Sequence, residues 1–388
     1  MSFVGSMMTS AVLPFQIYHQ THSSLDVGLL GLAQLGPLLF FAILGGALAD
    51  SFDKRRMLLV VTSVAICCSG GLAVNATLDH PQLWVVFVLG AATAAVFGST
   101  TPVVRSLLPL LLEVELRPAA FTLQSTYGSF GMMAGPALAG ILIGAFGVKT
   151  AYFVDAGTFV LALVAFARLR PSPPVSGAPP ASARSLLDGL RFLRGSLVTI
   201  VFGIDLLAMV FGMPRALFPA LAQRLGGGPA LYGLLLSSVA GGAFVASLMS
   251  GWTGRIRRQG AAVLMSVAVW GSAIAVAGLV RYVVLVLVSL AVAGGADMIS
   301  GVYRSTIAAD VTPDAMRGRV SGIELAVYAG GPSLGDVEAG VVGGLAGVPF
   351  AIVSGGVACV AAAGLFGAFV PRLARYVRPL PAEVVPAT

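Results

Sequence analysis

The feature of this chain that most restricts its fold is a succession of long apolar runs separated by short polar turns. A helix needs roughly 20 apolar residues to cross a bilayer, and most of the runs approach that length. Only 10% of the 388 residues are charged, whereas a soluble domain carries about 25%, so a soluble fold is excluded. The runs span residues 3–18, 27–49, 57–77, 83–104, 119–146, 151–167, 197–218, 231–252, 261–280, 282–302, 320–345 and 350–370. We therefore predict an all-α integral membrane protein with twelve transmembrane helices, of which the first is short.

A segment rich in proline, serine and alanine divides the runs into two sets of six. Such a composition resists regular structure, although from Ala181 onward apolar and charged residues follow the spacing of a short amphipathic helix. We predict an N-terminal six-helix half at 1–168, a cytoplasmic linker at 169–195, a C-terminal six-helix half at 196–371 and a cytoplasmic tail at 372–388.

The placement of Lys and Arg predicts the orientation in the membrane. Nearly all of the 23 cationic residues fall in segments on one side, and Arg304 is counted with them. The other side holds only Lys149, Arg224 and Arg281, and Arg215 lies within a run. Because cytoplasmic loops are enriched in Lys and Arg, we expect the basic side and both chain termini in the cytoplasm. No basic stretch precedes the first run, so a cleavable signal peptide is not expected.

The two halves resemble each other in sequence. Arg105 after the fourth run recurs as Arg304 after the tenth. The segment GMMAGPALAG (131–140) aligns with GPSLGDVEAG (331–340), with glycines at matching positions. A six-helix unit repeated in parallel is the architecture of a large class of membrane transporters.

The loop after the second run carries a motif, GGALADSFDKRRML at 45–58. It resembles the loop signature of the major facilitator superfamily, which combines a glycine, an acidic residue four positions later and a basic cluster. The residues at these positions are Gly46, Asp50, Lys54, Arg55 and Arg56. The resemblance implies a conformational gate, in which Asp50 contacts the start of the eleventh helix near Arg317 and Arg319 in the outward-open state. The positive-inside rule alone would explain the basic residues, but not Asp50.

The fifth run contains a second motif, GSFGMMAGPALAG at 128–140, which resembles the Gly-Pro signature of exporters in this superfamily. Its positions are Gly131, Gly135, Pro136 and Gly140. Glycines four apart share one helix face and allow close packing, here expected against the opposite half, and the proline bends the helix. Together with GMPRALFPALA and MRGRVSG, the chain resembles the enterobactin-exporter-like, transmembrane secretion effector branch. That resemblance implies an inner-membrane exporter of siderophores, antibiotics or other amphiphiles.

Two carboxylates, Asp336 and Glu338, stand within the apolar eleventh run. An ionised side chain inside a membrane helix costs about 2.5–3.5 kcal/mol on insertion scales, so each carboxylate needs water, a proton or a partner. Positions two apart on a helix differ by about 200°, so the two cannot face one cavity. Arg215 is the expected partner of one of them. A structural ion pair and a proton-coupling role for either acid remain open alternatives.

Further polar residues within the runs are candidates for binding substrate or protons. They are Asp205, Asp297, Glu324, Gln16 and Gln34. We expect Asp205 near mid-membrane and Asp297 with Glu324 toward the cytoplasmic side, where they would form an inner gate. The two glutamines are expected to contact substrate or to link helices. Asp155 is expected to be no more than interfacial.

These features predict secondary active export of an amphiphilic small molecule by alternating access, with inward proton flow. The fourth run holds no arginine, so the arginine signature of proton antiporters is missing from it and the acids carry the proton hypothesis. No phosphate-binding loop, metal cluster or nucleophile–base pair is evident in the sequence, so we expect no enzyme activity, cofactor or metal. The expected partners are the substrate, protons and the lipid bilayer, without nucleic acid, and the protein is expected to be a monomer. The alternatives are an importer or facilitator of the same fold and a non-transporting membrane sensor or assembly partner.

Overall fold

The computed structural model describes residues 2–169, 196–313 and 316–378, and these residues form helices and turns without a strand. The helices of the N-terminal part are α1 (Ser2–Thr21), α2 (Ser24–Ser51), α3 (Lys54–Asn75), α4 (Leu83–Leu111), α5 (Arg117–Phe146) and α6 (Val148–Ala167). Those of the C-terminal part are α8 (Leu197–Gly212), α9 (Phe218–Arg224), α10 (Pro229–Leu248), α11 (Gln259–Leu279), α12 (Val283–Val311), α13 (Arg317–Ala346), α14 (Val348–Phe369) and α15 (Pro371–Ala374). Short 3₁₀ helices are η1 (Val114–Leu116), η2 (Arg215–Leu217) and η3 (Ser250–Arg255).

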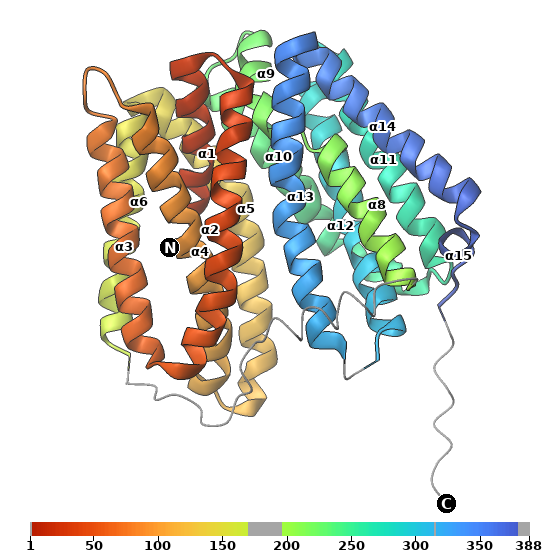
Figure 1. Cartoon of the computed structure of the whole chain (residues 1–388), viewed down its shortest axis with the longest axis horizontal. Coiled ribbons are helices and arrows are strands. Elements are labelled where there is room, and N and C mark those ends of the chain that lie inside the picture. The colour runs from red at the N-terminus through yellow and green to blue at the C-terminus, as the bar shows by residue number, and fades with distance from the viewer. Residues whose placement is uncertain (1, 170–195, 314–315, 379–388) are drawn as a thin grey trace, which may run out of the picture.

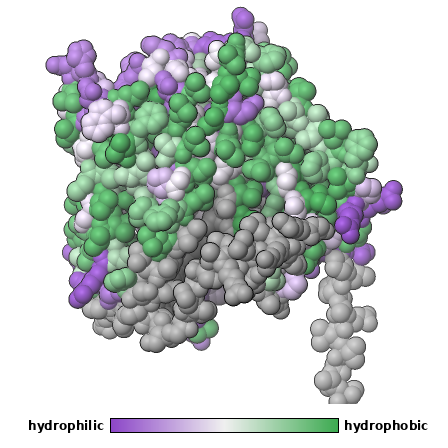
Figure 2. Space-filling view, in the orientation of Figure 1, coloured by the Kyte–Doolittle hydropathy of each residue, from purple (hydrophilic) through white to green (hydrophobic). Residues whose placement is uncertain are grey.

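Ten helical segments of the described residues are long and apolar enough to cross a membrane. Figure 2 shows a matching surface, on which apolar residues cover the middle of the visible face and hydrophilic residues gather at its upper rim. A bilayer offers no partner to backbone polar groups, which is why such runs form helices. The ten do not include α1 or α13, and both carry polar residues, such as Gln16 and Asp336. The all-helical membrane class is therefore confirmed, and the count of twelve spans stays a prediction.

The helices form two halves that lie side by side, α1–α6 and α8–α15 (Figure 1). The halves contact each other chiefly through α2 against α13 and through α5 against α10. Of the predicted linker at 169–195, only Leu169 belongs to the described residues, and the predicted tail is described only as far as Arg378. The predicted domain boundaries therefore stay predictions.

The contacts between the halves concentrate at one end of the bundle. We call the end with the α2–α3, α4–α5, α10–α11 and α12–α13 connections the basic end, and the other the opposite end. Near the opposite end, a Cβ added at Gly140 of α5 would lie 2.6 Å from Pro229 O of α10. On the second seam, a Cβ added at Gly340 of α13 would lie 2.6 Å from Ser24 O of α2. Only glycine permits such backbone approaches, so the halves are closed against each other here.

Toward the basic end, α5 is uncovered. Phe121, Thr122 and Leu123 are consecutive and all exposed, and so are Ser125 and Thr126. Consecutive residues on a helix point about 100° apart, so no described element covers this stretch on any side. The halves are thus joined at the opposite end and separated along α5 at the basic end.

Two predicted helix ends are wrong. α12 continues to Val311, beyond the predicted end at 302, so Arg304 lies inside a helix and not in a loop. α4 continues to Leu111, which places Arg105 within it. Apolar runs end where side chains become polar, but a helix continues when those side chains face other helices. The end of an apolar run therefore shows where the sequence becomes polar and not where the helix ends.

The seventh predicted helix, 197–218, is broken. α8 ends at Gly212, and after Met213 and Pro214 the chain continues as η2 and α9. Proline lacks an N–H and disfavours helical backbone angles in the residue before it. Arg215 therefore lies in a 3₁₀ turn and not within a continuous membrane helix.

Candidate functional site

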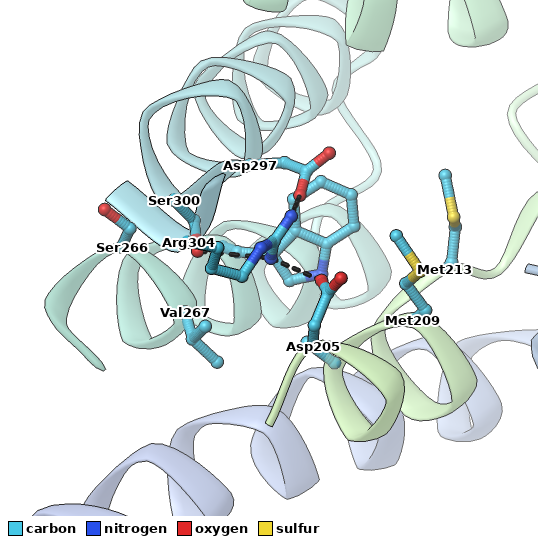
Figure 3. A pocket seen from close by; sticks show the side chains of 10 residues that line it. Asp205, Met209, Met213, Ser266, Val267, Asp297, Ser300 and Arg304 are labelled. Carbon is cyan, nitrogen blue, oxygen red and sulfur yellow. Dashed lines mark hydrogen bonds and ion pairs between the residues drawn. The ribbon is translucent and has the colours of Figure 1, made fainter. Parts of the chain in front are cut away.

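The centre of the candidate site is a buried cation on α12, Arg304, which is 8% exposed. Its Nη1 pairs with Asp205 Oδ1 on α8, and its Nη2 lies 3.4 Å from Asp297 Oδ1 (Figure 3). Nη1 also donates to Ser300 Oγ at 3.2 Å. Asp297, Ser300 and Arg304 are spaced by three and four residues, so α12 presents all of them on one face. Two of the predicted acids thus share one guanidinium.

The cluster holds more negative than positive charge. Asp205 and Asp297 both face Arg304, and Glu324 on α13 accepts a hydrogen bond from Ser305 Oγ at 3.2 Å, one residue further along α12. A single guanidinium neutralises only one of these carboxylates, and attraction between charges is strong where water is sparse. A proton or a cationic group of a ligand would complete the charge balance.

A small pocket opens beside the cluster and draws on α8, α11 and α12. Its lining residues are Asp205, Ala208, Met209, Met213, Ser266, Val267, Trp270, Asp297, Ser300 and Arg304. Figure 3 shows Met209 and Met213 standing beside Asp205, away from the guanidinium. Flexible thioethers and an indole next to a few charged groups suit a ligand that is part apolar and part polar.

The break after α8 is tied to both neighbouring helices. In an uninterrupted helix, Ala216 N–H would donate to Gly212 O. Here Ala216 N–H donates to Asp336 Oδ1 of α13 at 3.1 Å, and Gly212 O accepts from Trp270 Nε1 of α11 at 3.0 Å. Each group of the lost helical bond therefore has a side-chain partner, and one of the two partners is a predicted site residue.

The ion pair expected for the acids of α13 is present. Arg215 Nη2 lies 2.9 Å from Asp336 Oδ2, with the arginine side chain 41% exposed and the aspartate side chain 13% exposed. A Cβ added at Gly31 of α2 would lie 3.4 Å from the same oxygen. The pair therefore stands where α2 crosses α13, at the closed end. The arginine is half-exposed but Asp336 is buried, so removing the arginine alone would leave a buried carboxylate without its counterion.

The remaining predicted residues are not part of either cluster. Glu338 is half-buried, and no ion pair joins it to another described residue. Gln16 accepts from Tyr152 Oη at 2.7 Å inside the N-terminal half, and Gln34 Nε2 donates to Gly90 O at 3.3 Å. In the described structure both glutamines link helices of one half.

Residues in and next to the loop motif also stabilise the ends of α3 and α6. Asp53 stands where the superfamily often has glycine, and it caps α3 by accepting from Arg56 N at 2.9 Å. Arg55 Nη2 donates to Ala167 O at the end of α6 at 2.6 Å, and Lys54 is buried. The side chains of Asp50, Arg317 and Arg319, with the surroundings of Gly46, lie outside what the structure describes, so the predicted gate contact stays a prediction.

The exporter-type motif of α5 faces two different neighbours. A Cβ added at Gly131 would lie 2.6 Å from Phe3 Cδ1, and one at Gly135 would lie 2.5 Å from Met7 Cβ, both on α1 of the same half. Gly140 alone of the three glycines meets the opposite half, at α10. The expected packing of this helix on the opposite half is present through Pro136 O and Gly140, which both approach Gly233 of α10. The other two glycines face α1 instead, because Gly140 lies about 140° around the helix from Gly135.

Asp155 is not interfacial, as the sequence suggested, but buried inside the N-terminal half at 1% exposure. It lies about two turns into α6, because the helix already begins at Val148. Sequence reasoning also missed Arg304, which the run ending at 302 assigned to a loop. The three- and four-residue spacing from Asp297 to Arg304 was the available signal. Trp270 carried no signal, since its bond depends on the break in another helix.

Comparison with known proteins gives the family. A model of the transmembrane secretion effector family matches residues 1–375. The enterobactin exporter EntS of Shigella boydii serotype 18 is 30% identical over 350 residues, which cover 89% of this chain and 82% of the exporter. The enterobactin exporter EntS of Escherichia coli (strain SE11) is 29% identical with the same coverage.

Solved structures show the same fold at low identity. The nucleoside transporter NupG superposes with a TM-score of 0.76 at 14% identity, over 95% of this chain and 96% of that one. A POT family transporter in complex with a thioalcohol-conjugated peptide superposes with a TM-score of 0.70 at 12% identity, over 96% of this chain and 95% of that one. Because the family model spans nearly the whole chain, the protein belongs to the transmembrane secretion effector family of the major facilitator superfamily, and it is an integral membrane transport protein and not an enzyme.

Proposed function

We propose that the protein is a secondary active exporter that moves amphiphilic small molecules out of the cell by alternating access, coupled to inward proton flow. The observation that supports this most is the buried Asp205–Arg304–Asp297 cluster beside a pocket. Replacing buried ions by apolar side chains is often neutral or stabilising, so a purely structural bundle has little use for them. Ionisable residues within membrane helices mark pathways for substrates and protons.

Alternating access would arise from two six-helix repeats, with α1 and α13 counted among twelve spans. Two observations support the repeat. The α5–α6 turn has Gly147 at φ 83°, and the α13–α14 turn has Gly347 at φ 88°. Gly140 and Gly340, which align in sequence, each contact the other half at the opposite end. With the basic end in the cytoplasm, as the distribution of Lys and Arg favours, the described conformation is inward-open.

Coupling would act through competition for the carboxylates of the cluster. A proton on Asp205 weakens its hold on Arg304, which is then free to pair with Asp297 alone. A substrate that donates hydrogen bonds or carries positive charge competes for the same two carboxylates. Such competition makes proton and substrate binding mutually exclusive, which antiport requires.

The proposed substrate class rests on the relatives, and the side chains beside the pocket fit it. Met209, Met213 and Trp270 offer apolar and polarizable contacts beside the charged groups, which suits an amphiphile. Relatives at 30% identity are enterobactin exporters, which favours siderophore-like molecules, with antibiotic-like amphiphiles as the second class.

Two gates would alternate. The Arg215–Asp336 pair belongs to the gate at the opposite end, where α2 and α13 meet in the described conformation. The predicted contact of Asp50 with Arg317 or Arg319 would form when the basic end closes. The gate at the opposite end also includes the close backbone packing at Gly140 and Gly340, so opening it breaks helix packing as well as one ion pair.

Proton flux in inverted membrane vesicles tests the proposal. A pH-sensitive dye reports proton release from acid-loaded vesicles when siderophores or amphiphilic antibiotics are added to wild type and to Asp205→Asn, Asp336→Asn and Glu338→Gln at matched protein levels. We expect ligand-dependent proton release in wild type and a fall of about tenfold or more in Asp205→Asn, the usual scale of coupling between two sites.

Asp79→Asn is the matched control, because this acid lies exposed in the α3–α4 turn. It should behave as wild type. Ligand accumulation without proton movement would contradict antiport. Wild-type flux in Asp205→Asn would remove the cluster from the mechanism.

A further inference from the structure

A second buried carboxylate lies in the N-terminal half, outside the site described above. Thr9 Oγ1 of α1 donates to Asp155 Oδ2 of α6 at 2.6 Å. Ser69 Oγ of α3 donates to the same oxygen at 2.8 Å. Three helices thus converge on one carboxylate oxygen, in a position that is 1% exposed.

The other oxygen, Asp155 Oδ1, is buried and has no hydrogen-bond partner among the described residues. It points at Gly5 of α1, where an added Cβ would overlap with Oδ1 and with Thr158 Oγ1. The Thr158 hydroxyl beside it donates to the backbone carbonyl of Asp155 at 2.8 Å. The backbone of α1 therefore fills the space in which a metal cation would need its own shell of ligands.

No cation of the described residues is paired with Asp155. The ionisable groups nearest to it on α6 and α3 are Tyr152, whose Oη donates to Gln16, and Cys68, next to Ser69. α1 contributes Tyr18 and His19, both toward its C-terminal end. The cations of α3 and α6 lie at helix ends, namely Lys54, Arg55, Arg56 and the exposed Lys149.

We propose that Asp155 is a proton-binding site of the N-terminal half, occupied in the described conformation. An ionised carboxylate here would be buried in the membrane with one oxygen unpartnered and no opposite charge, which is costly. In the acid form one of the two hydroxyl bonds reverses at the same oxygen–oxygen distance, so that a proton on Oδ2 is donated to the hydroxyl oxygen of Thr9 or Ser69 while the other hydroxyl still donates to Oδ2. A hydroxyl on a helix can in turn donate to the carbonyl of the preceding turn. In the neutral form the only atom without a hydrogen bond is therefore Oδ1, an uncharged carbonyl oxygen, which costs less to bury than a charged one.

The site is connected to the closed end through α1. Tyr232 Oη of α10 donates to Ala11 O at 2.8 Å, so α1 also touches the opposite half. Thr9 and Ala11 are two residues apart and therefore point to nearly opposite sides of the helix. Proton uptake at Asp155 keeps α1 seated on α6 and so favours closure of the opposite end, while proton loss favours its opening. The inference goes beyond the exporter proposal, since it needs no substrate and holds whether or not export is proton-coupled.

Infrared spectroscopy of the purified full-length protein tests proton binding directly. We expect a carbonyl band of a buried protonated carboxyl group, and its loss in Asp155→Asn. Thr9→Val removes a donor to the ionised form, so its band should persist to a pH about one unit higher, equivalent to about tenfold greater proton affinity. A carbonyl band of equal intensity in wild type and Asp155→Asn would overturn the proposal, and so would a Thr9→Val band with unchanged pH dependence.

Spin labels at Lys149 and Arg224, exposed on the two halves near the opposite end, report the conformation without substrate. In wild type the short distance should dominate at low pH and decline as pH rises, and in Asp155→Asn it should dominate throughout. Asp79→Asn is again the control and should follow wild type. Replacing choline by sodium as the buffer cation at constant pH should change neither the infrared carbonyl band nor the distance between the spin labels. A sodium-dependent loss of the band would assign a metal cation and overturn the proton site.

Discussion

Replacement of Arg304 by glutamine is expected to abolish transport and to lower the free energy of unfolding by about 3–5 kcal/mol. The guanidinium pairs with the buried Asp205 and lies 3.4 Å from Oδ1 of the partly exposed Asp297, so its removal leaves two carboxylates without a counterion. Transport is measured in the vesicle assay, and stability by denaturant unfolding of the protein in detergent.

The matched control is Arg378→Gln. Arg378 Nε lies 3.4 Å from Asp310 Oδ2 in an exposed pair, so its loss should change stability by less than about 1 kcal/mol. The double variant Arg304→Gln with Asp205→Asn should regain much of the lost stability, because it removes one of the unpaired charges, but should not regain transport. Transport at the wild-type rate in Arg304→Gln would reject the proposed mechanism.

Replacement of Gly140 by leucine is expected to force the opposite end open. The added side chain would meet Pro229 O, Gly233 Cα and Ala230 Cα, which are backbone atoms that no rotamer change can move. Overpacking of this kind costs about 1–3 kcal/mol. The closed population, read from the spin labels at Lys149 and Arg224, should fall by about 5- to 150-fold relative to the open one.

Gly144→Leu provides the control, since it lies one turn further along α5 and has nothing within 4 Å of an added Cβ. Its label distances should match those of wild type. An unchanged closed population in Gly140→Leu would mean that α5 and α10 are not held together as described. Equal opening by both leucines would point to a general effect on α5.

The membrane class and the helical elements could be predicted because hydropathy along the chain reports directly on solvent. Helix ends and breaks could not, since they depend on tertiary partners. α12 continues past 302 because Arg304 has two carboxylates to face, which no local pattern reveals. The break at Pro214 persists because Trp270 and Asp336, distant in sequence, bond the groups it releases.

For the site, the sequence identified the acids but not their partners. The Arg215–Asp336 pair was predictable because few cations stand within the apolar runs. Asp155 was misplaced because its depth depends on where α6 begins, and Thr9 and Ser69 give no hint in sequence that they meet one carboxylate. Position along a helix can be read from sequence, whereas convergence of several helices cannot.

The break in the seventh segment leaves two rods that share one neighbour, because α8 packs along α13 and η2 also lies against α13. The lower rod, α8, is attached to α11 through Gly212 O, and the upper part, η2 with α9, is attached to α13 through Ala216 N. Because the helical bond between Gly212 O and Ala216 N–H is absent, bending between the two rods acts on side-chain hydrogen bonds and not on the continuous backbone of a helix. The break therefore acts as a hinge at which η2 and α9 can tilt while the charged pocket on α8 keeps its shape.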